Sequence, residues 1–206
     1  MFVKVCGLST PESVREAVDA GADAVGFVLT ASPRVVTPSQ ASSLLTGVPA
    51  GVSPIGVFRH EPVADAVAIA RAAGLEWIQL HGPRSREDVV MVHDAGMKLI
   101  RAVTMGATAD EFEDWGEDLL LIDAAVPGSG EAWDYASVAA LPVLQGRHWL
   151  LAGGLDPATV GGASTAAHAW GVDVSSGVEA SRGVKDLAKI RAFVQAAKGA
   201  AARVQA

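Results

Sequence analysis

The sequence predicts an α/β protein, a (β/α)8 TIM barrel that forms a single domain over residues 1–206. Three observations support this prediction. Short runs of β-branched and other apolar residues alternate with longer amphipathic stretches from end to end. Eight such strand–helix units fit into 206 residues, which leaves about 26 residues for each unit. No linker, low-complexity tract or shift in composition divides the chain.

Each expected strand is short and mostly apolar, as in a parallel sheet that is covered on both faces. The expected strands are residues 2–6, 24–29, 53–58, 76–80, 98–103, 119–123, 149–152 and 171–174. The expected helices are residues 11–20, 38–45, 62–73, 85–94, 109–115, 135–141, 157–166 and 186–202. In the third helix Val63, Val67 and Ala70 share one face, and Gly74 supplies a stop.

Two architectures accommodate this alternation, a doubly wound open sheet and a closed barrel. An open sheet that binds a dinucleotide would carry a G-x-G-x-x-G turn after an early strand. The turn after the first strand has only one glycine, Gly7. Eight units therefore favour the barrel, although this chain is shorter than the usual ~250 residues.

Composition limits the classes of partner. Half of the residues are hydrophobic, and the formal net charge is −7 with a pI near 5.1. Nucleic acid is an improbable main partner because phosphate-backbone binding needs clustered Lys and Arg. No apolar run suits a membrane span, and residues at the N-terminus do not have the pattern of a signal peptide. We expect a cytoplasmic protein with no membrane partner.

Cys6 is the only cysteine, and it ends the first predicted strand, before a helix that begins at Thr10-Pro11. Active sites of parallel α/β folds are built at this end of the strands. A lone cysteine excludes an internal disulfide and a multi-cysteine zinc site, but a buried structural thiol is an equally good interpretation. As a base, the thiol would need a lowered pKa, for which the first helix dipole offers one means, or would act through its small thiolate fraction.

Two turns late in the chain indicate phosphate binding. Gly153-Gly154 follows the seventh strand, and Ser175-Ser176 follows the eighth. In barrels the loops after strands seven and eight commonly hold a phosphate, through backbone N–H groups that glycine allows to come close. The alternative is that the glycine pair only makes a tight turn.

Three further residues lie where the strands end. Asp123 is either a turn residue or a general acid, since burial beside apolar walls raises a carboxyl pKa. Arg34, in the loop after the second strand, is either solvated or the partner of a substrate carboxylate. His81 ends the fourth strand and either titrates near neutral pH or hydrogen-bonds within its loop. The other histidines lack ligand-like spacing, so no metal site is expected.

Several segments, in order, resemble the phosphoribosylanthranilate isomerase family over nearly the whole chain. The segments are VKVCGL at 3–8, SPR at 32–34, QLHG at 79–82, LID at 121–123, GSG at 128–130, LAGGL at 151–155 and GVDVSSGVE at 171–179. Any one glycine turn would be weak evidence, whereas the ordered set is specific.

The resemblance implies a TIM-barrel enzyme of tryptophan biosynthesis. Such an enzyme converts N-(5-phosphoribosyl)anthranilate, an aminoaldose, into an aminoketose by an Amadori rearrangement. Asp123 would protonate the ring oxygen of the ribose, and Cys6 would remove the proton from the adjacent sugar carbon as a thiolate. The implied substrate-binding residues are Arg34 for the anthranilate carboxylate, Gly153, Gly154, Ser175 and Ser176 for the phosphate, and His81 and Asp173. No cofactor or metal is implied.

One segment departs from the family pattern. After Asp123 the chain reads Gly128-Ser129-Gly130-Glu131, where a Gly-Thr-Gly-like segment and a basic or neutral residue are expected. We assign Glu131 no role.

Two other functions compete with this one. A related barrel could rearrange a histidine-pathway aminoaldose, but those barrels usually use two aspartates, and here the first strand ends in Cys6. A catalytically silent barrel that binds a phosphorylated ligand would be free to lose Cys6 or Asp123. The sequence leaves open whether the protein is a monomer or a homodimer.

Overall fold

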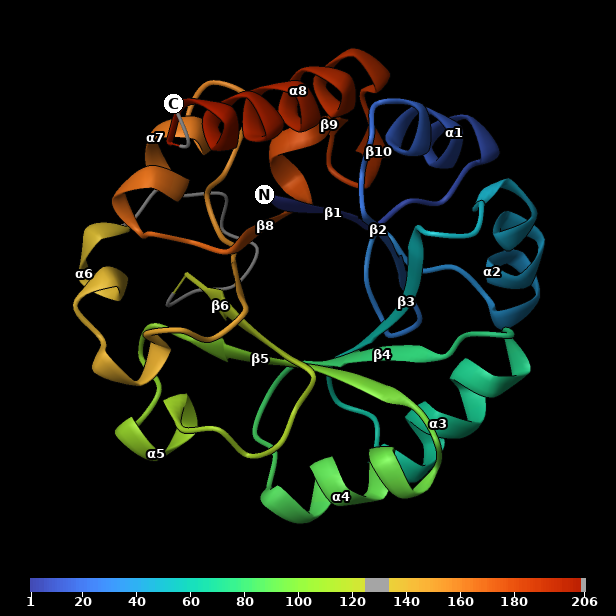
Figure 1. Cartoon of the computed structure of the whole chain (residues 1–206). Helices are drawn as coiled ribbons and strands as arrows, with labels where there is room; N and C mark the ends of the chain where they lie inside the picture. The colour runs from blue at the N-terminus through green and yellow to red at the C-terminus, as the bar shows by residue number, and fades with distance from the viewer. Residues whose placement is uncertain (125–133, 205–206) are drawn as a thin grey trace.

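The structure is a computed structural model that describes residues 1–124 and 134–204. Its centre is a closed barrel of parallel strands, viewed nearly along its axis in Figure 1. The strands are β1 (Phe2–Cys6), β2 (Ala24–Val28), β3 (Ser53–Phe58), β4 (Trp77–Leu80), β5 (Lys98–Thr104), β6 (Leu119–Asp123), β7 (Trp149–Leu151) and β8 (Gly171–Val174). Each strand pairs with the next in the sequence, and β1 closes the barrel against β8. The predicted closed barrel is confirmed.

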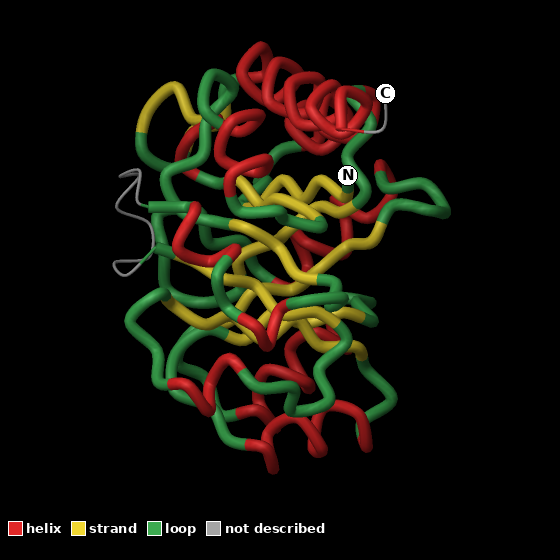
Figure 2. Tube along the Cα trace, turned by 60° about the vertical axis from the view of Figure 1, so that its left-hand side comes forward, coloured by secondary structure: helices red, strands yellow, loops and turns green. Residues whose placement is uncertain are grey.

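Helices surround the barrel on its outside (Figures 1 and 2). They are α1 (Pro11–Asp19), α2 (Pro38–Leu44), α3 (Val63–Ala72), α4 (Arg86–Asp94), α5 (Ala109–Phe112), α6 (Ala136–Ala139), α7 (Val160–Ala166) and α8 (Leu187–Val204). One-turn 3-10 helices are η1 (Leu45–Gly47), η2 (Pro142–Leu144) and η3 (Ser176–Val178). Among the helices that the structure describes, none is long and apolar enough to cross a membrane.

Local capping fixes where the helices begin. The Thr10 hydroxyl accepts the N–H of Ser13 at 3.2 Å, and Pro11 occupies the first turn of α1, as predicted. The seventh helix begins later than expected, because the Asp156 carboxylate accepts the N–H groups of Ala158 and Thr159 and holds them in a turn.

The strand predictions agree with the structure to within one residue at each end, but three helices are shorter than predicted. α5 ends at Phe112 because Glu113 is extended, and α6 gives way to η2, which Pro142 begins. A small antiparallel pair, β9 (Glu179–Ser181) and β10 (Val184–Lys185), was not predicted. Its polar, two- and three-residue strands carry no apolar alternation.

The side chains of β1 illustrate how the barrel separates two cores. Val3 and Val5 belong to the core between the barrel and its helices, while Cys6 belongs to a small cluster inside the barrel with Val28 and Val57. A second interior cluster is larger and apolar, with Ala24, Ile55, Ile100, Ala102, Leu119, Leu121, Leu150 and Ala152. The carboxyl end of the barrel interior is therefore where polar side chains are accommodated.

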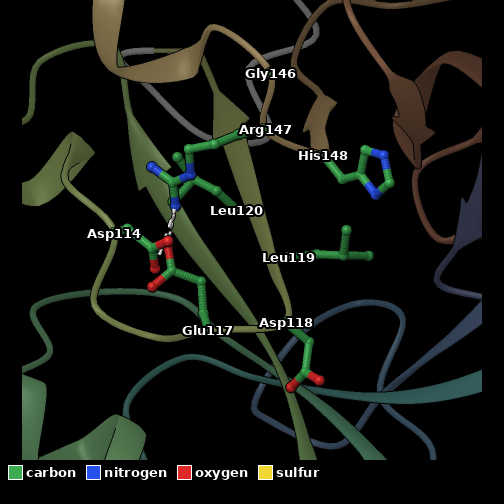
Figure 3. Close-up of a pocket in the computed structure, with 8 residues that line it drawn as sticks. All are labelled: Asp114, Glu117, Asp118, Leu119, Leu120, Gly146, Arg147 and His148. Carbon is green, nitrogen blue, oxygen red and sulfur yellow. Dashed lines mark hydrogen bonds and ion pairs between the residues drawn. The ribbon is translucent and has the colours of Figure 1, made fainter.

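A buried ion network holds the corner between β5 and β6. The Glu117 carboxylate, fully buried, accepts from the guanidinium groups of Arg101 and Arg147 at 2.8 Å each. It also accepts the N–H of Trp115 at 3.0 Å. Glu117 and Arg147 line a cavity of about 230 Å³ (Figure 3), and a second cavity of about 250 Å³ includes Phe2 and Trp170. Both cavities are lined mainly by residues at or near the beginnings of strands, at the end of the barrel opposite Cys6 and Asp123.

We predict that Glu117→Ala destabilises the protein by about 3–5 kcal/mol, because it leaves the buried charge of Arg101 without its counter-ion. The free energy of unfolding, measured with a chemical denaturant, tests this. Arg191→Ala is the control: it breaks an ion pair with Glu16 whose arginine side chain is 57% exposed, and its unfolding should remain close to that of the wild type. A Glu117→Ala protein as stable as this control would contradict the prediction.

Candidate active site

The carboxyl ends of three barrel strands bring together the side chains at the centre of the candidate site. Cys6 ends β1, Asp123 ends β6, and Asp173 lies one residue before the end of β8. Each of the three residues is less than 10% exposed. Lys4 lies below Cys6 on the same side of β1, fully buried, and interacts electrostatically with Cys6, Asp123 and Asp173. The four groups therefore form one electrostatic unit inside the barrel mouth.

Lys4 is a site residue that the sequence interpretation missed. Its ammonium donates to Asp173 Oδ1 at 2.9 Å and also interacts electrostatically with Cys6. The signal was available, since a lysine two residues before the cysteine lies on the same face of a strand otherwise made of apolar residues. A buried lysine needs a buried anion, but the sequence alone does not show that Asp173 is that anion.

Burial raises the pKa of the Cys6 thiol, against the opposing effect of Lys4. The free protein thus favours the alternative in which the base acts through a small thiolate fraction. Space around the sulfur is tight: a Cβ added to Gly26 on β2 would lie 2.9 Å from Cys6 Sγ. Glycine at this position leaves room for the thiol.

Burial raises the pKa of Asp123 to about 6, and the negative charge of Asp173 adds to the effect. The N–H of Ala124, which donates to Asp123 Oδ1 at 2.8 Å, opposes it. A carboxyl group with such a pKa carries a proton in part of the population near neutral pH. It is thus suited to donate that proton to a substrate, as predicted for a general acid.

His81 remains neutral. Burial, with the nearby cations of Lys4, Arg59 and Arg84, lowers the pKa of its imidazole to about 3. The amide nitrogen of Gln79 lies 2.7 Å from His81 Nε2, so the ring accepts there and carries its proton on Nδ1. Of the two alternatives for His81, titration near neutral pH is not supported, and its hydrogen bond is to a side chain of β4 and not within its own loop.

Arg34 is neither solvated nor free. Its Nε donates to Glu179 Oε1 at 2.5 Å and its Nη2 to Glu179 Oε2 at 3.1 Å, and only 17% of its side chain is exposed. Lys185 donates to the same carboxylate at 3.3 Å and to the Ser175 carbonyl at 2.7 Å. Glu179 and Lys185 are positioning residues that sequence reasoning missed, because they act through contacts between distant loops.

The arginine lies directly beside the first turn. A Cβ added to Gly7 would come within 2.7 Å of Arg34 Cδ and 3.2 Å of Ser175 Oγ. The tip of the β9–β10 pair packs on the same loop, since a Cβ at Gly183 would lie 2.7 Å from the Pro33 carbonyl oxygen. The loops after β1, β2 and β8 therefore meet at Arg34.

The two turns predicted to bind phosphate also meet. Gly153 and Gly154 both have positive φ, of 80° and 66°. Gly177, next to the predicted Ser176, packs so closely on the turn after β7 that an added Cβ would lie 1.9 Å from the Leu155 carbonyl oxygen. The turns after β7 and β8 thus form one surface.

Backbone donors on this surface lack partners within the described part of the chain. The N–H groups of Gly153, Gly154, Ser176 and Gly177 donate to no backbone or side-chain acceptor there. Gly153 also leaves room for the Asp123 carboxylate, because a Cβ there would lie 2.7 Å from Asp123 Oδ1. The tight turn and the donor surface are therefore compatible interpretations of the same glycine pair. The segment Gly128-Ser129-Gly130-Glu131 lies outside the described residues.

Comparisons with known proteins agree with this geometry. Residues 3–196 match the family model described as N-(5'phosphoribosyl)anthranilate (PRA) isomerase. The chain belongs to this family. It is 40% identical over 203 residues to N-(5'-phosphoribosyl)anthranilate isomerase from Pelobacter propionicus, with 95% of each chain covered.

Solved structures of phosphoribosylanthranilate isomerases share the fold. The enzyme from Thermus thermophilus superposes with a TM-score of 0.88 at 33% identity, covering 97% of this chain and 99% of that one. A second isomerase structure, in complex with reduced 1-(o-carboxyphenylamino)-1-deoxyribulose 5-phosphate, gives a TM-score of 0.84 at 32% identity, with the same coverage. That ligand carries one phosphate and one carboxylate, the two groups for which the sequence predicted separate binding sites.

The raised pKa of Asp123 makes a prediction about stability in this isomerase. The folded protein holds the proton more tightly than the unfolded chain, so stability falls as pH rises from the usual value of 3.8 through about 6. Asp123→Asn removes this penalty, and above that range it should unfold with a free energy about 1–3 kcal/mol higher than the wild type. Denaturant unfolding at several pH values tests this, and a gain that does not shrink toward pH 3.8 would contradict it.

Proposed function

We propose that this chain isomerises N-(5-phosphoribosyl)anthranilate with Asp123 as the general acid and Cys6 as the general base. The reaction itself is that of the family to which the chain belongs. The assignment of roles is supported by one observation above all: a carboxyl group with a pKa of about 6 and the only thiol of the chain share one barrel mouth.

The first step opens the ribose ring. Asp123 donates its proton to the ring oxygen while the bond from that oxygen to the anomeric carbon breaks. The lone pair of the anthranilate nitrogen forms a C=N bond to that carbon, which gives a protonated Schiff base. The acid needs a proton at the start, and its burial maintains one.

The second step moves a proton from carbon. The Cys6 thiolate removes the proton from the sugar carbon next to the C=N bond, and the electron pair moves to the nitrogen to give an enolamine. A proton then returns from the thiol to the former anomeric carbon while the enol hydroxyl loses its own, which gives the aminoketose. The proton lost from the hydroxyl replaces the one that Asp123 donated, so atoms and charge balance over the reaction. The substrate's own nitrogen accepts the electrons, and the two side chains suffice for the proton transfers.

Two anchors on the loops around the mouth orient the substrate. The unpartnered N–H groups of the turns after β7 and β8 suit the phosphate, and they need no positive side chain. Arg34 suits the carboxylate. Because Glu179 occupies its Nε and one Nη2 donor, Arg34 would present the donors of its Nη1–Nη2 edge. The substrate then spans the mouth with its sugar between Cys6 and Asp123.

We expect Cys6→Ser to lose nearly all turnover while product affinity stays similar, since the hydroxyl keeps the size but ionises far less easily.

Asp123→Asn should reduce kcat by about 10²–10⁴-fold, since it preserves shape and abolishes proton donation. Conversion of N-(5-phosphoribosyl)anthranilate, followed by chromatography, measures both, with the histidine-pathway aminoaldose as the competing substrate. Wild-type turnover in either variant, or preference for the competing substrate, would refute the assignment it tests.

The two anchors predict different effects of substitution. Arg34→Met should raise KM, and Gly154→Ala should raise both KM and the inhibition constant of inorganic phosphate. Gly96→Ala is the matched control for Gly154→Ala, because Gly96 also has positive φ, of 72°, but lies at the end of α4 with no atom within 4 Å of an added Cβ. If phosphate inhibition weakened in Arg34→Met and not in Gly154→Ala, the orientation would be reversed.

A further inference from the structure

The pair formed by Lys4 and Asp173 has no part in the two proton transfers above, yet both of its side chains are buried in the barrel mouth. Lys4 is 0% exposed and its ammonium lies 2.9 Å from Asp173 Oδ1. The two residues are direct partners in the register of β1 and β8. The same ammonium interacts electrostatically with Cys6, which lies two residues further along β1 on the same face of the strand.

Charge balance around this ammonium is uneven. Cys6 and Asp173 can each become an anion, and Lys4 is the cation with the largest effect on both: it donates to Asp173 Oδ1 at 2.9 Å and lowers the pKa of each group. An isolated buried anion is costly because the interior screens charge weakly. One buried cation therefore stabilises one of the two anions at a time.

The other groups around Cys6 do not change this count. From β10, Lys185 lowers the pKa of both Cys6 and Asp173, but less than Lys4 does, and its ammonium is bonded to Glu179 and to the Ser175 carbonyl. From the neighbouring strands, β2 contributes Gly26 and Val28 and β3 contributes Val57, none of which titrates. From β6 Asp123 interacts with Lys4 and Asp173, and from β4 His81 is neutral.

We propose that Lys4 is a positioning residue that holds Cys6 as the thiolate, and that Asp173 competes with the sulfur for this ammonium. Ionisation of Cys6 is then coupled to protonation of Asp173, so the proton that leaves the sulfur is matched by one on the carboxylate. The buried charge of the three groups stays constant in this exchange.

This inference depends on the proposed function only for its consequence in turnover. The ionisation of Cys6 can be measured in the free protein, without substrate. Because Cys6 is the only cysteine, the ultraviolet absorbance of a thiolate and the rate of alkylation by iodoacetamide both report on it alone. Cys6→Ala supplies the background.

The two partners should shift the titration in opposite directions. Lys4→Met should raise the apparent pKa of the thiol, and Asp173→Asn should lower it, each by about one unit, a tenfold change in the thiolate fraction at neutral pH. Lys98→Met, which removes the same charge from an exposed position at the start of β5, should leave the titration unchanged. A thiol pKa that is unchanged in both variants, or that moves in the same direction in both, would overturn the proposal.

Two further measurements separate a failure to fold from a failure of the proposal. Should Lys4→Met fail to fold because Asp173 is left as a buried anion, the double variant Lys4→Met with Asp173→Asn removes that charge, and its thiol pKa should still lie above that of Asp173→Asn alone. In turnover, Lys4→Met should move the pH profile of kcat/KM upward on its acidic side, which a purely structural role would not do. If the titrations shift as expected while Cys6→Ser remains active, the coupling stands and the role of Cys6 as base fails.

Discussion

The pairing of β1 with β8 is the contact on which the candidate site depends. It closes the barrel, and it joins Lys4 to Asp173 across 169 residues of sequence. Without this closure Lys4 would have no buried anion, and a buried lysine without one would be strongly destabilising. The ion pair and the barrel closure therefore support each other, and the position of Cys6 follows from both.

A second set of contacts fixes the loops above the barrel. The Glu179 carboxylate accepts hydrogen bonds from both Arg34 and Lys185. The Lys189 ammonium donates to the Glu179 carbonyl at 2.7 Å. These contacts tie the loop after β2 to the short β9–β10 pair and to α8. An arginine proposed to bind a carboxylate from a loop needs such support, since a long side chain loses rotamer freedom when it binds. Glu179 lowers that cost by ordering Arg34 beforehand.

The strands, the closed barrel and the polar residues at the strand ends could be predicted from the sequence. Cys6, Asp123 and Asp173 could be found because a polar residue at the end of an apolar strand is conspicuous, and in a parallel barrel all such ends face one mouth. Lys4 and Glu179 could not be assigned in the same way. Their roles depend on which distant residue each one contacts, and strand register and loop packing decide this.

The environment of the site acts in opposite ways on its two proposed catalytic groups. Burial raises the pKa of Asp123 and so keeps a proton on the group that must donate one. The same burial raises the pKa of Cys6 and so keeps a proton on the group that must accept one. A site that relied on burial alone would make a good acid and a poor base. Lys4 is the largest influence that opposes burial at Cys6, whereas at Asp123 the same cation has less effect than burial, the Ala124 N–H and Asp173.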